Sequence, residues 1–196
     1  MERRFERDAE LRQKYVTFMR EYKSLGHMTR IDETDARGRR CYLPHHGVLK
    51  GDGPSAKLRI VFNGSAPLPG SDTLNRYLYV GPNLMPALAD VLLGWRRYQF
   101  AYTADIEKMY RQIMVDDADR DLQCILWRET AKAFMAEYRL NTVTYKLACA
   151  PYLAAQALRQ LAADEAARFP RGAGRTKLMW MTSCLAGSPW RRRARP

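Results

Sequence analysis

Residues 99 to 106 form a mostly apolar stretch that carries one carboxylate, Asp105, near its end. An aromatic side chain, Tyr110, follows five residues later. The pattern predicts a buried strand that ends at a carboxylate, and carboxylate oxygens are the ligands that Mg²⁺ prefers in proteins. A single Asp in such a position is more often a cap or a turn residue. A metal-binding role for Asp105 therefore depends on what surrounds it.

The charge of the chain points to a polyanionic partner. Its 33 Lys and Arg residues exceed its 21 Asp and Glu residues, and the formal net charge is +12. Clustered cations gain affinity for nucleic acid because binding releases the counterions of the phosphates. The alternative is a basic surface that only keeps the protein in solution. With 46% hydrophobic residues among 196, the chain can bury a real core.

The cysteines and the hydropathy pattern bear on the compartment. No apolar run approaches the length of a membrane span, and the chain is charged from its second residue, so we expect no signal peptide. We expect an intracellular, cytoplasmic protein that is not secreted and does not enter a membrane. The four cysteines lack metal-binding or disulfide spacing and are expected to be reduced thiols: Cys41, Cys124, Cys149 and Cys184.

The periodicity predicts an α+β fold. One or two amphipathic helices are expected between residues 4 and 26, stopped by Gly26. Strands at 41–50 and 57–62 flank a Gly- and Pro-containing turn and should form a hairpin. The other expected elements are a loop at 63–70, a helix at 82–94, the strand at 99–106, a polar turn at 116–119, strands at 122–127 and 138–145, and a helix at 147–168.

Five groups of residues occur in a fixed order along the chain. They are 42–50 with 57–66, 74–75 with 80–82, 104–112 with 125–128, 141–145, and 150–154. In this order they resemble the reverse transcriptases of Bel/Pao-type LTR retrotransposons, and the resemblance covers nearly all of residues 1 to 170. It implies the fingers and a partial palm of a right-hand polymerase, a fold of the DNA/RNA polymerase type. The implied divisions are 1–95 for the N-terminal helices and fingers, 96–170 for the partial palm, and 171–196 for an aberrant basic tail, expected to be disordered.

The resemblance also implies a chemistry. Enzymes of this family extend a primer with the help of two Mg²⁺ ions about 4 Å apart. The implied partners are an RNA template, an RNA/DNA hybrid and a deoxynucleoside triphosphate. Carried over to this sequence, the catalytic and metal-binding residues are Asp105 and the backbone carbonyl of Ile106. The nucleotide-binding residues are Lys57, Arg59, Tyr110 and Tyr145, and the nucleic-acid contacts are Lys50, Arg111 and Gln112.

Each nucleotide-binding residue also has a plain structural alternative. Lys57 and Arg59 suit a triphosphate because a guanidinium binds phosphate oxygens in pairs and an ammonium acts as a point charge. Without the resemblance they indicate only a solvated strand face. Tyr110 is implied to test the sugar 2′ position, but it also suits the core. Tyr145 is implied to lie under the nucleotide or the template.

Three positions depart from the family pattern. Lys146 stands where the pattern has Gly, and Cys149 stands where it has Ser. Asn63 replaces an Asp. A long cation at 146 is expected to obstruct a site that backbone must approach closely.

The second metal motif of the family, Tyr-Val-Asp-Asp, is missing. In its expected place stand Met179, Trp180, Met181 and Thr182. The codons TAT-GTG-GAT-GAC spell Tyr-Val-Asp-Asp, and the same bases read one nucleotide later spell Met-Trp-Met-Thr. Residues 190–194, Trp-Arg-Arg-Arg-Ala, likewise read as an acidic segment one base earlier. Our hypothesis is that the chain beyond Pro170 is translated out of frame.

Two functions follow from the sequence. The first is a fragment of a retrotransposon RNA-directed DNA polymerase that lacks activity, because Asp105 alone provides too little carboxylate charge for two Mg²⁺ ions. The second is a noncatalytic basic module that binds nucleic acid. Asp116, Asp117 and Asp119 are the only nearby carboxylate cluster, and they are expected to form a solvated turn rather than a substitute metal site. Loss of a central palm hairpin would leave an unpaired strand edge and a chain of marginal stability.

Overall fold

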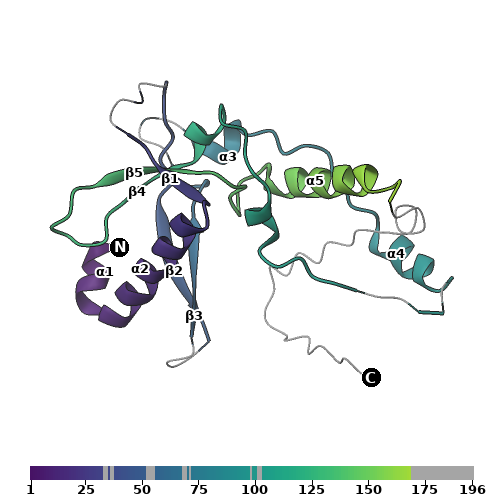
Figure 1. The fold of residues 1–196 in the computed structure, drawn as a ribbon, viewed down its shortest axis with the longest axis horizontal. Coiled ribbons are helices and arrows are strands. Elements are labelled where there is room, and N and C mark those ends of the chain that lie inside the picture. The colour runs from purple at the N-terminus through teal and green to yellow at the C-terminus, as the bar shows by residue number, and fades with distance from the viewer. Residues whose placement is uncertain are drawn as a thin grey trace.

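The computed structural model describes residues 1–32, 35, 38–51, 56–67, 70, 72–97, 99–100 and 103–168. These residues form an α+β fold of helices and small antiparallel sheets (Figure 1). The helices are α1 (Glu2–Arg7), α2 (Ala9–Ser24), α3 (Leu74–Tyr77), α4 (Leu88–Trp95) and α5 (Ala150–Asp164), with short 3-10 helices η1 (Met109–Gln112) and η2 (Arg120–Gln123). The strands are β1 (Met28–Arg30), β2 (His45–Lys50), β3 (Lys57–Phe62), β4 (Cys124–Trp127) and β5 (Ala136–Leu140).

The predicted N-terminal helices are confirmed. The side chain of Asp8 caps α2 by accepting a hydrogen bond of 2.8 Å from the Leu11 amide. Gly26, with φ of +72°, ends the helical region in a left-handed conformation that suits glycine. The apolar residues of α2 recur at helical spacing and face the core: Leu11, Tyr15, Val16, Met19 and Tyr22.

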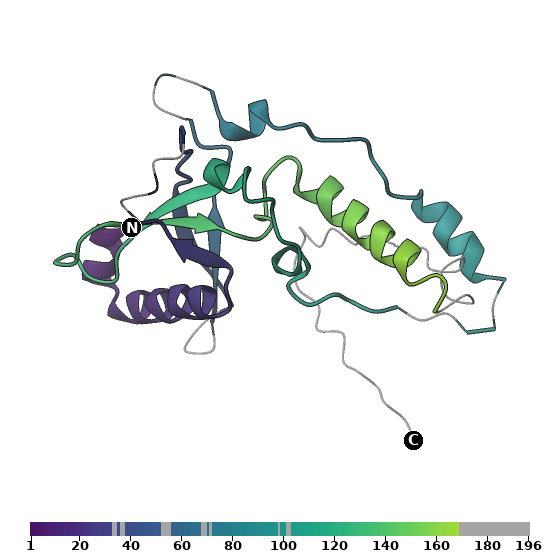
Figure 2. The ribbon, with the colours of Figure 1, turned by 45° about the horizontal axis from the view of Figure 1, so that its top comes forward.

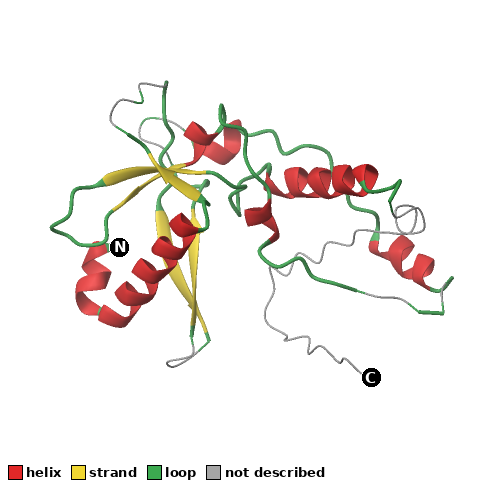
Figure 3. Ribbon diagram, viewed as in Figure 1, coloured by secondary structure: helices red, strands yellow, loops and turns green. Residues whose placement is uncertain are grey.

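The strands form two sheets. β2 and β3 make the predicted hairpin, with His45 opposite Phe62 and Lys50 opposite Lys57. The other sheet has the order β1-β5-β4 and is antiparallel throughout. Figure 3 shows both sheets beside α2, at the end of the molecule away from α4 and α5.

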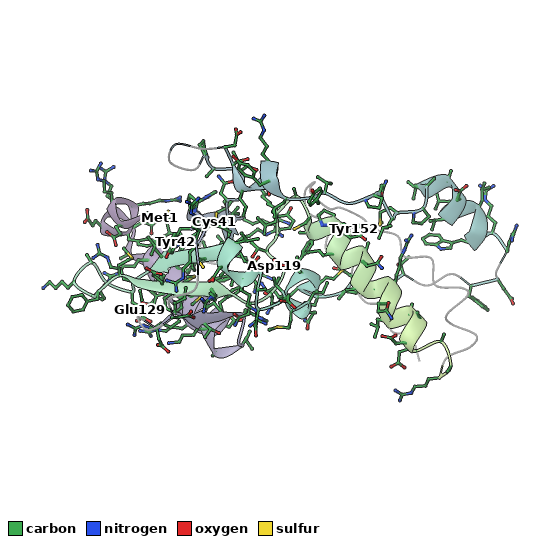
Figure 4. All side chains as sticks on the ribbon, turned by 90° about the horizontal axis from the view of Figure 1, so that it is seen from above. Met1, Cys41, Tyr42, Asp119, Glu129 and Tyr152 are labelled. Carbon is green, nitrogen blue, oxygen red and sulfur yellow. The ribbon has the colours of Figure 1, made fainter. Side chains whose placement is uncertain are left out.

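A hydrogen-bonded segment joins the two sheets. The amide of Leu43 donates to Cys124 O at 2.8 Å, and the amide of Cys124 donates to Cys41 O at 2.9 Å. Figure 4 labels Cys41 and Tyr42 on this segment, beside the β4–β5 pair. The segment therefore covers the edge of β4 and leads the chain into β2.

Aromatic side chains fill the core between α2 and the sheets. The ring of Tyr15 is stacked on Trp127 at 5.2 Å and meets Phe5 edge-on at 5.1 Å between centroids. Its hydroxyl donates to Nδ1 of His45, and His45 Nε2 donates to Leu126 O at 2.9 Å. The same core includes residues on both sides of position 95, from Tyr15 to Ala150. The division of the chain at residue 95 stays a prediction.

The part of the molecule that contains α4 and α5 is more open (Figure 2). Residues 79–87 lie outside helices and strands and reach α5 through Gly81, where an added Cβ would lie 2.4 Å from the ring of Tyr152. Arg159 of α5 donates to Leu84 O. Only Val91 of α4 is buried.

The predicted strand at 99–106 is wrong for the residues described there. Residues 99, 100 and 103–106 are exposed and lie outside any strand, and 101–102 lie outside the description. Phe100 is 67% exposed and Ile106 is 42% exposed. A strand needs a neighbour for its backbone N–H and C=O groups, and no described strand pairs with this stretch. Apolar composition alone cannot replace that neighbour.

Other helices and strands begin or end a few residues away from their predicted boundaries. The helix expected at 82–94 begins only at Leu88, and the strand expected at 138–145 ends at Leu140. The helix expected at 147–168 spans Ala150–Asp164, and the turn before it contains Lys146, whose φ is +73°. Strand β1 was not expected, since three residues carry no usable period. The basic tail at 171–196 lies outside the described residues.

Candidate nucleic-acid interface

The β2–β3 hairpin has one face toward the core and one face away from it. Opposite residues of an antiparallel pair share a face, so Gly47 and Ile60 lie together on the core side. An added Cβ at Gly47 would lie 3.3 Å from the ring of Tyr15 on α2. The other face therefore carries Arg59 opposite Val48, and Lys57 opposite Lys50. Lys50, Lys57 and Arg59 are all exposed.

Three of the predicted nucleotide-binding residues lie near one another, and one of them, Tyr110, is partly buried and also packs against the hydrophobic core. The guanidinium carbon of Arg59 lies 5.7 Å from the ring centroid of Tyr145. The ring of Tyr145 in turn lies 5.6 Å from that of Tyr110, at an angle of 57°. The three residues come from β3, from the loop before α5 and from η1. We call them the Arg59–Tyr145–Tyr110 cluster.

Tyr145 is held by the turn that follows it. The side chain of Asn75 accepts from the Ala148 amide at 2.8 Å and donates to Lys146 O at 3.0 Å. These bonds fix the two ends of a turn in which Lys146 is left-handed. Gly64 packs under it, because an added Cβ there would lie 2.5 Å from the Leu147 side chain. The position where the family pattern has Gly is thus one whose backbone conformation suits glycine.

Tyr110 is held by a short backbone pairing. Met114 pairs with Thr142 in an antiparallel bridge. The amide of Val115 donates to Asn141 O at 2.8 Å, and the amide of Val143 donates to Ile113 O at 2.9 Å. This pairing brings η1 to the strand end that leads to Tyr145.

Arg111 points to α2 rather than to the hairpin. Its guanidinium carbon lies 5.0 Å from the ring centroids of both Phe18 and Tyr22, which are stacked on each other at 5.5 Å. Next to it, Lys108 Nζ lies 3.6 Å from Glu21 of α2. Burial raises the pKa of Tyr22, an increase that the charge of Arg111 partly offsets. Gln112, also predicted as a nucleic-acid contact, is exposed and donates to Glu107 O at 3.4 Å.

Asp105 and Ile106 lie on an exposed segment before η1. Within the part of the chain that the structure describes, no group of three or more His, Cys, Asp or Glu side chains could hold a metal ion. The described residues therefore do not fit a two-Mg²⁺ centre, which needs several carboxylate oxygens around the ions.

The polar turn at 116–119 has the expected character. Asp116 Oδ1 accepts from the Ala118 amide at 3.0 Å, and Asp117 pairs with Arg120. All four residues of the turn are exposed, and the structure places Asp119 between the sheets and α5 (Figure 4). These carboxylates close a turn.

An ion-pair network that joins β5 to η2 and to residues 35 and 40 was missed by sequence reasoning. Arg139 of β5 binds Asp121 at 2.6 Å and also pairs with Asp35. Arg40 binds Glu137 at 3.1 Å. The carboxylates raise the pKa of Arg139, so the pair stays charged. The only sequence signal of this network is the pair of charged residues at 137 and 139. Their partners could not be predicted, because they are distant in sequence.

The described cysteines are free thiols. Cys124 is buried, and burial raises its pKa to about 12. Cys41 and Cys149 also have raised pKa values because of burial. None of the three is therefore activated as a thiolate at neutral pH. Cys184 lies outside the described residues.

Comparison with known proteins gives no family. No family model matches this chain. No curated protein compared with it is similar. Within the described residues, we find no helix with the length and apolar character needed to cross a membrane.

Proposed function

We propose that this chain is the fingers and partial palm of a retroelement RNA-directed DNA polymerase that has lost catalysis and retains binding of nucleic acid. Its ligand class is a single strand or hybrid end with exposed phosphates and an unstacked base. The binding residues are Lys50, Lys57 and Arg59 of the hairpin together with Tyr145 and Tyr110.

The Arg59–Tyr145–Tyr110 cluster is the observation that supports this proposal most. Its members are far apart in sequence, and each was assigned to the nucleotide by a resemblance that used no coordinates. Cations that flank aromatic rings suit a strand whose phosphates meet the cations while a base stacks on a ring.

The absence of catalysis rests on a separate argument. The described residues around Asp105 do not fit a two-metal centre, and the sequence has Met179 to Thr182 where the second carboxylate pair is expected. Each electrostatic element of such a site is worth several kcal/mol of barrier. We therefore expect no primer extension with Mg²⁺ or Mn²⁺, with or without Asp105→Asn.

Binding is tested by titrating the protein into a fluorescein-labelled oligouridylate at several salt concentrations. The double variant Lys57→Gln/Arg59→Gln should bind more weakly, and the slope of log K against log salt should fall by about 2, one for each lost phosphate contact. The matched control is Arg96→Gln/Arg97→Gln, which removes the same charge from the exposed end of α4. An equal loss in both double variants would show that only net charge matters, and the proposed interface would be abandoned.

Tyr145→Leu separates stacking from charge in the same titration. It should weaken binding without changing the salt slope, because a ring contributes no counterion release. If Tyr145→Leu binds as the unchanged protein does, Tyr145 does not stack on the ligand.

A further inference from the structure

We infer that Arg111 is a positioning residue, which anchors the segment bearing Tyr110 to α2 through a cation–π contact instead of contacting nucleic acid itself. This inference rests on the proposed function, since what Arg111 positions is the Arg59–Tyr145–Tyr110 cluster. It assigns to Arg111 a role different from the one that the sequence suggested.

The geometry around Arg111 is that of an anchor. Its guanidinium is equidistant, at 5.0 Å, from the Phe18 and Tyr22 ring centroids, and the two rings belong to successive turns of α2. A cation within about 6 Å of a ring centroid is attracted by the negative face of the ring. Arg111 is partly buried there, whereas the hairpin cations Lys57 and Arg59 are exposed. The group is therefore held at the α2 side of η1.

Holding Arg111 in place also fixes the position of Tyr110, because the two residues are adjacent. Arg111 and Tyr110 are neighbours in η1, and the Arg111 amide donates to Lys108 O at 2.7 Å. Lys108 is left-handed, with φ of +51°, and its ammonium reaches Glu21 on the same helix. The segment thus meets α2 at two points, and the ring of Tyr110 lies next to that of Tyr145.

Arg111→Lys distinguishes this role from a phosphate contact. A phosphate contact tolerates lysine, because an ammonium also binds phosphate. A stacked guanidinium does not, because lysine lacks the planar group that covers both rings. We expect Arg111→Lys and Arg111→Leu to weaken oligouridylate binding to the same extent, with an unchanged salt slope. A slope that falls by about 1 in Arg111→Leu, with binding largely retained in Arg111→Lys, would overturn the inference.

Substitution of the ring partner gives an independent test. Phe18→Leu should weaken binding as Arg111→Leu does, and the double variant should be no weaker than either single one, because both remove the same contact. Additive losses in the double variant would count against the anchor.

Amide hydrogen exchange tests the anchor without any ligand. In Arg111→Lys and in Phe18→Leu, exchange at the amides of residues 111, 113 and 115 should be faster, while the amide of Ile125 in β4 keeps its rate and reports global stability. Unchanged exchange in the 111–115 segment overturns the inference even if binding is lost. If no form of the protein binds the oligonucleotide but the exchange result is as expected, the proposed function fails and the anchor stands.

Discussion

Lys146 adopts a backbone conformation that suits glycine. Its φ of +73° places a Cβ where it collides with the neighbouring carbonyl oxygen, which costs about 1–2 kcal/mol in a residue with a side chain. The turn keeps this conformation despite the cost, because the Asn75 side chain is hydrogen-bonded to the backbone at both of its ends. Glycine, which the resemblance implies at this position, would remove this backbone strain.

Lys146→Gly should therefore stabilise the protein. We expect a gain of about 1 kcal/mol or less in the free energy of unfolding, because relief of strain exceeds the added flexibility of glycine in the unfolded chain. Lys146→Ala removes the same charge but keeps the Cβ, so it should give no gain. Urea denaturation measures both. Equal stability of the two variants would refute the claim of strain at this position.

His45 makes the stability depend on pH. It is neutral in the folded protein, because Nδ1 accepts from the Tyr15 hydroxyl while Nε2 donates to Leu126 O, and burial lowers its pKa. The unfolded chain therefore binds more protons than the folded one below about pH 6.5. The stabilisation is present above that pH and is lost as the pH falls toward the lowered folded pKa.

His45→Gln should reduce the slope of unfolding free energy against pH just below about pH 6.5, the ordinary pKa of histidine. The slope does not vanish, since burial and Arg111 also lower the pKa of His27. An unchanged slope in His45→Gln would contradict a neutral His45 in the folded protein.

At the scale of elements, the sequence predicted what a local pattern encodes. Helix α2 carries its apolar residues at helical spacing, and the β2–β3 hairpin has a strong turn signal between two strands. The stretch at 99–106 has the composition of a strand, but a strand also depends on a partner that composition does not supply. Strand β1 is only three residues long, and its pairing with β5 joins segments more than 100 residues apart.

The candidate site likewise contains residues that the sequence indicated and residues that only the tertiary contacts reveal. Arg59, Tyr110 and Tyr145 were named through the resemblance, since nothing in their spacing brings them together. Asn75 and Gly64, which hold the turn after Tyr145, are single residues whose role depends on tertiary contacts. Arg111 looks from the sequence like any other cation in a basic chain, and only the position of Phe18 and Tyr22 shows what it packs on.

The contact between the 79–87 segment and α5 depends on a glycine. Gly81→Ala would force a Cβ to within 2.4 Å of the Tyr152 ring, at a residue whose φ is +75°. We expect a loss of at least 1–3 kcal/mol, because backbone strain and steric overlap add. Thermal or urea unfolding measures it.

Gly70 provides the matched control for that substitution. It has a similar φ of +68°, but no heavy atom of the residues that the structure describes lies within 4 Å of an added Cβ. Gly70→Ala should thus show the strain without the overlap and destabilise the protein less. If the free energy of unfolding falls equally in the two variants, the close approach of residue 81 to Tyr152 does not contribute to the destabilisation.

At the scale of the whole molecule, the two ends differ in how well they are covered. The end with α2 and the sheets has a hydrophobic core, which includes Tyr15, Tyr22, Phe62 and Trp127. On α4, by contrast, Leu88, Leu92 and Leu93 are exposed. Exposed leucines on one helix are usual where a further part of a fold would pack. The marginal stability expected for a palm without its catalytic hairpin remains a prediction.

The relation to a reverse transcriptase is the central claim, and the nucleotide sequence of the gene and its transcript tests it most directly. The codons for residues 165 to 196, and those that follow, should encode Tyr-Val-Asp-Asp one base away from the frame that gives Met179 to Thr182. A polymerase sequence should continue in that frame. If the shifted frame encodes neither, the hypothesis of a frameshifted polymerase is wrong, and a noncatalytic basic module that binds nucleic acid becomes the better account.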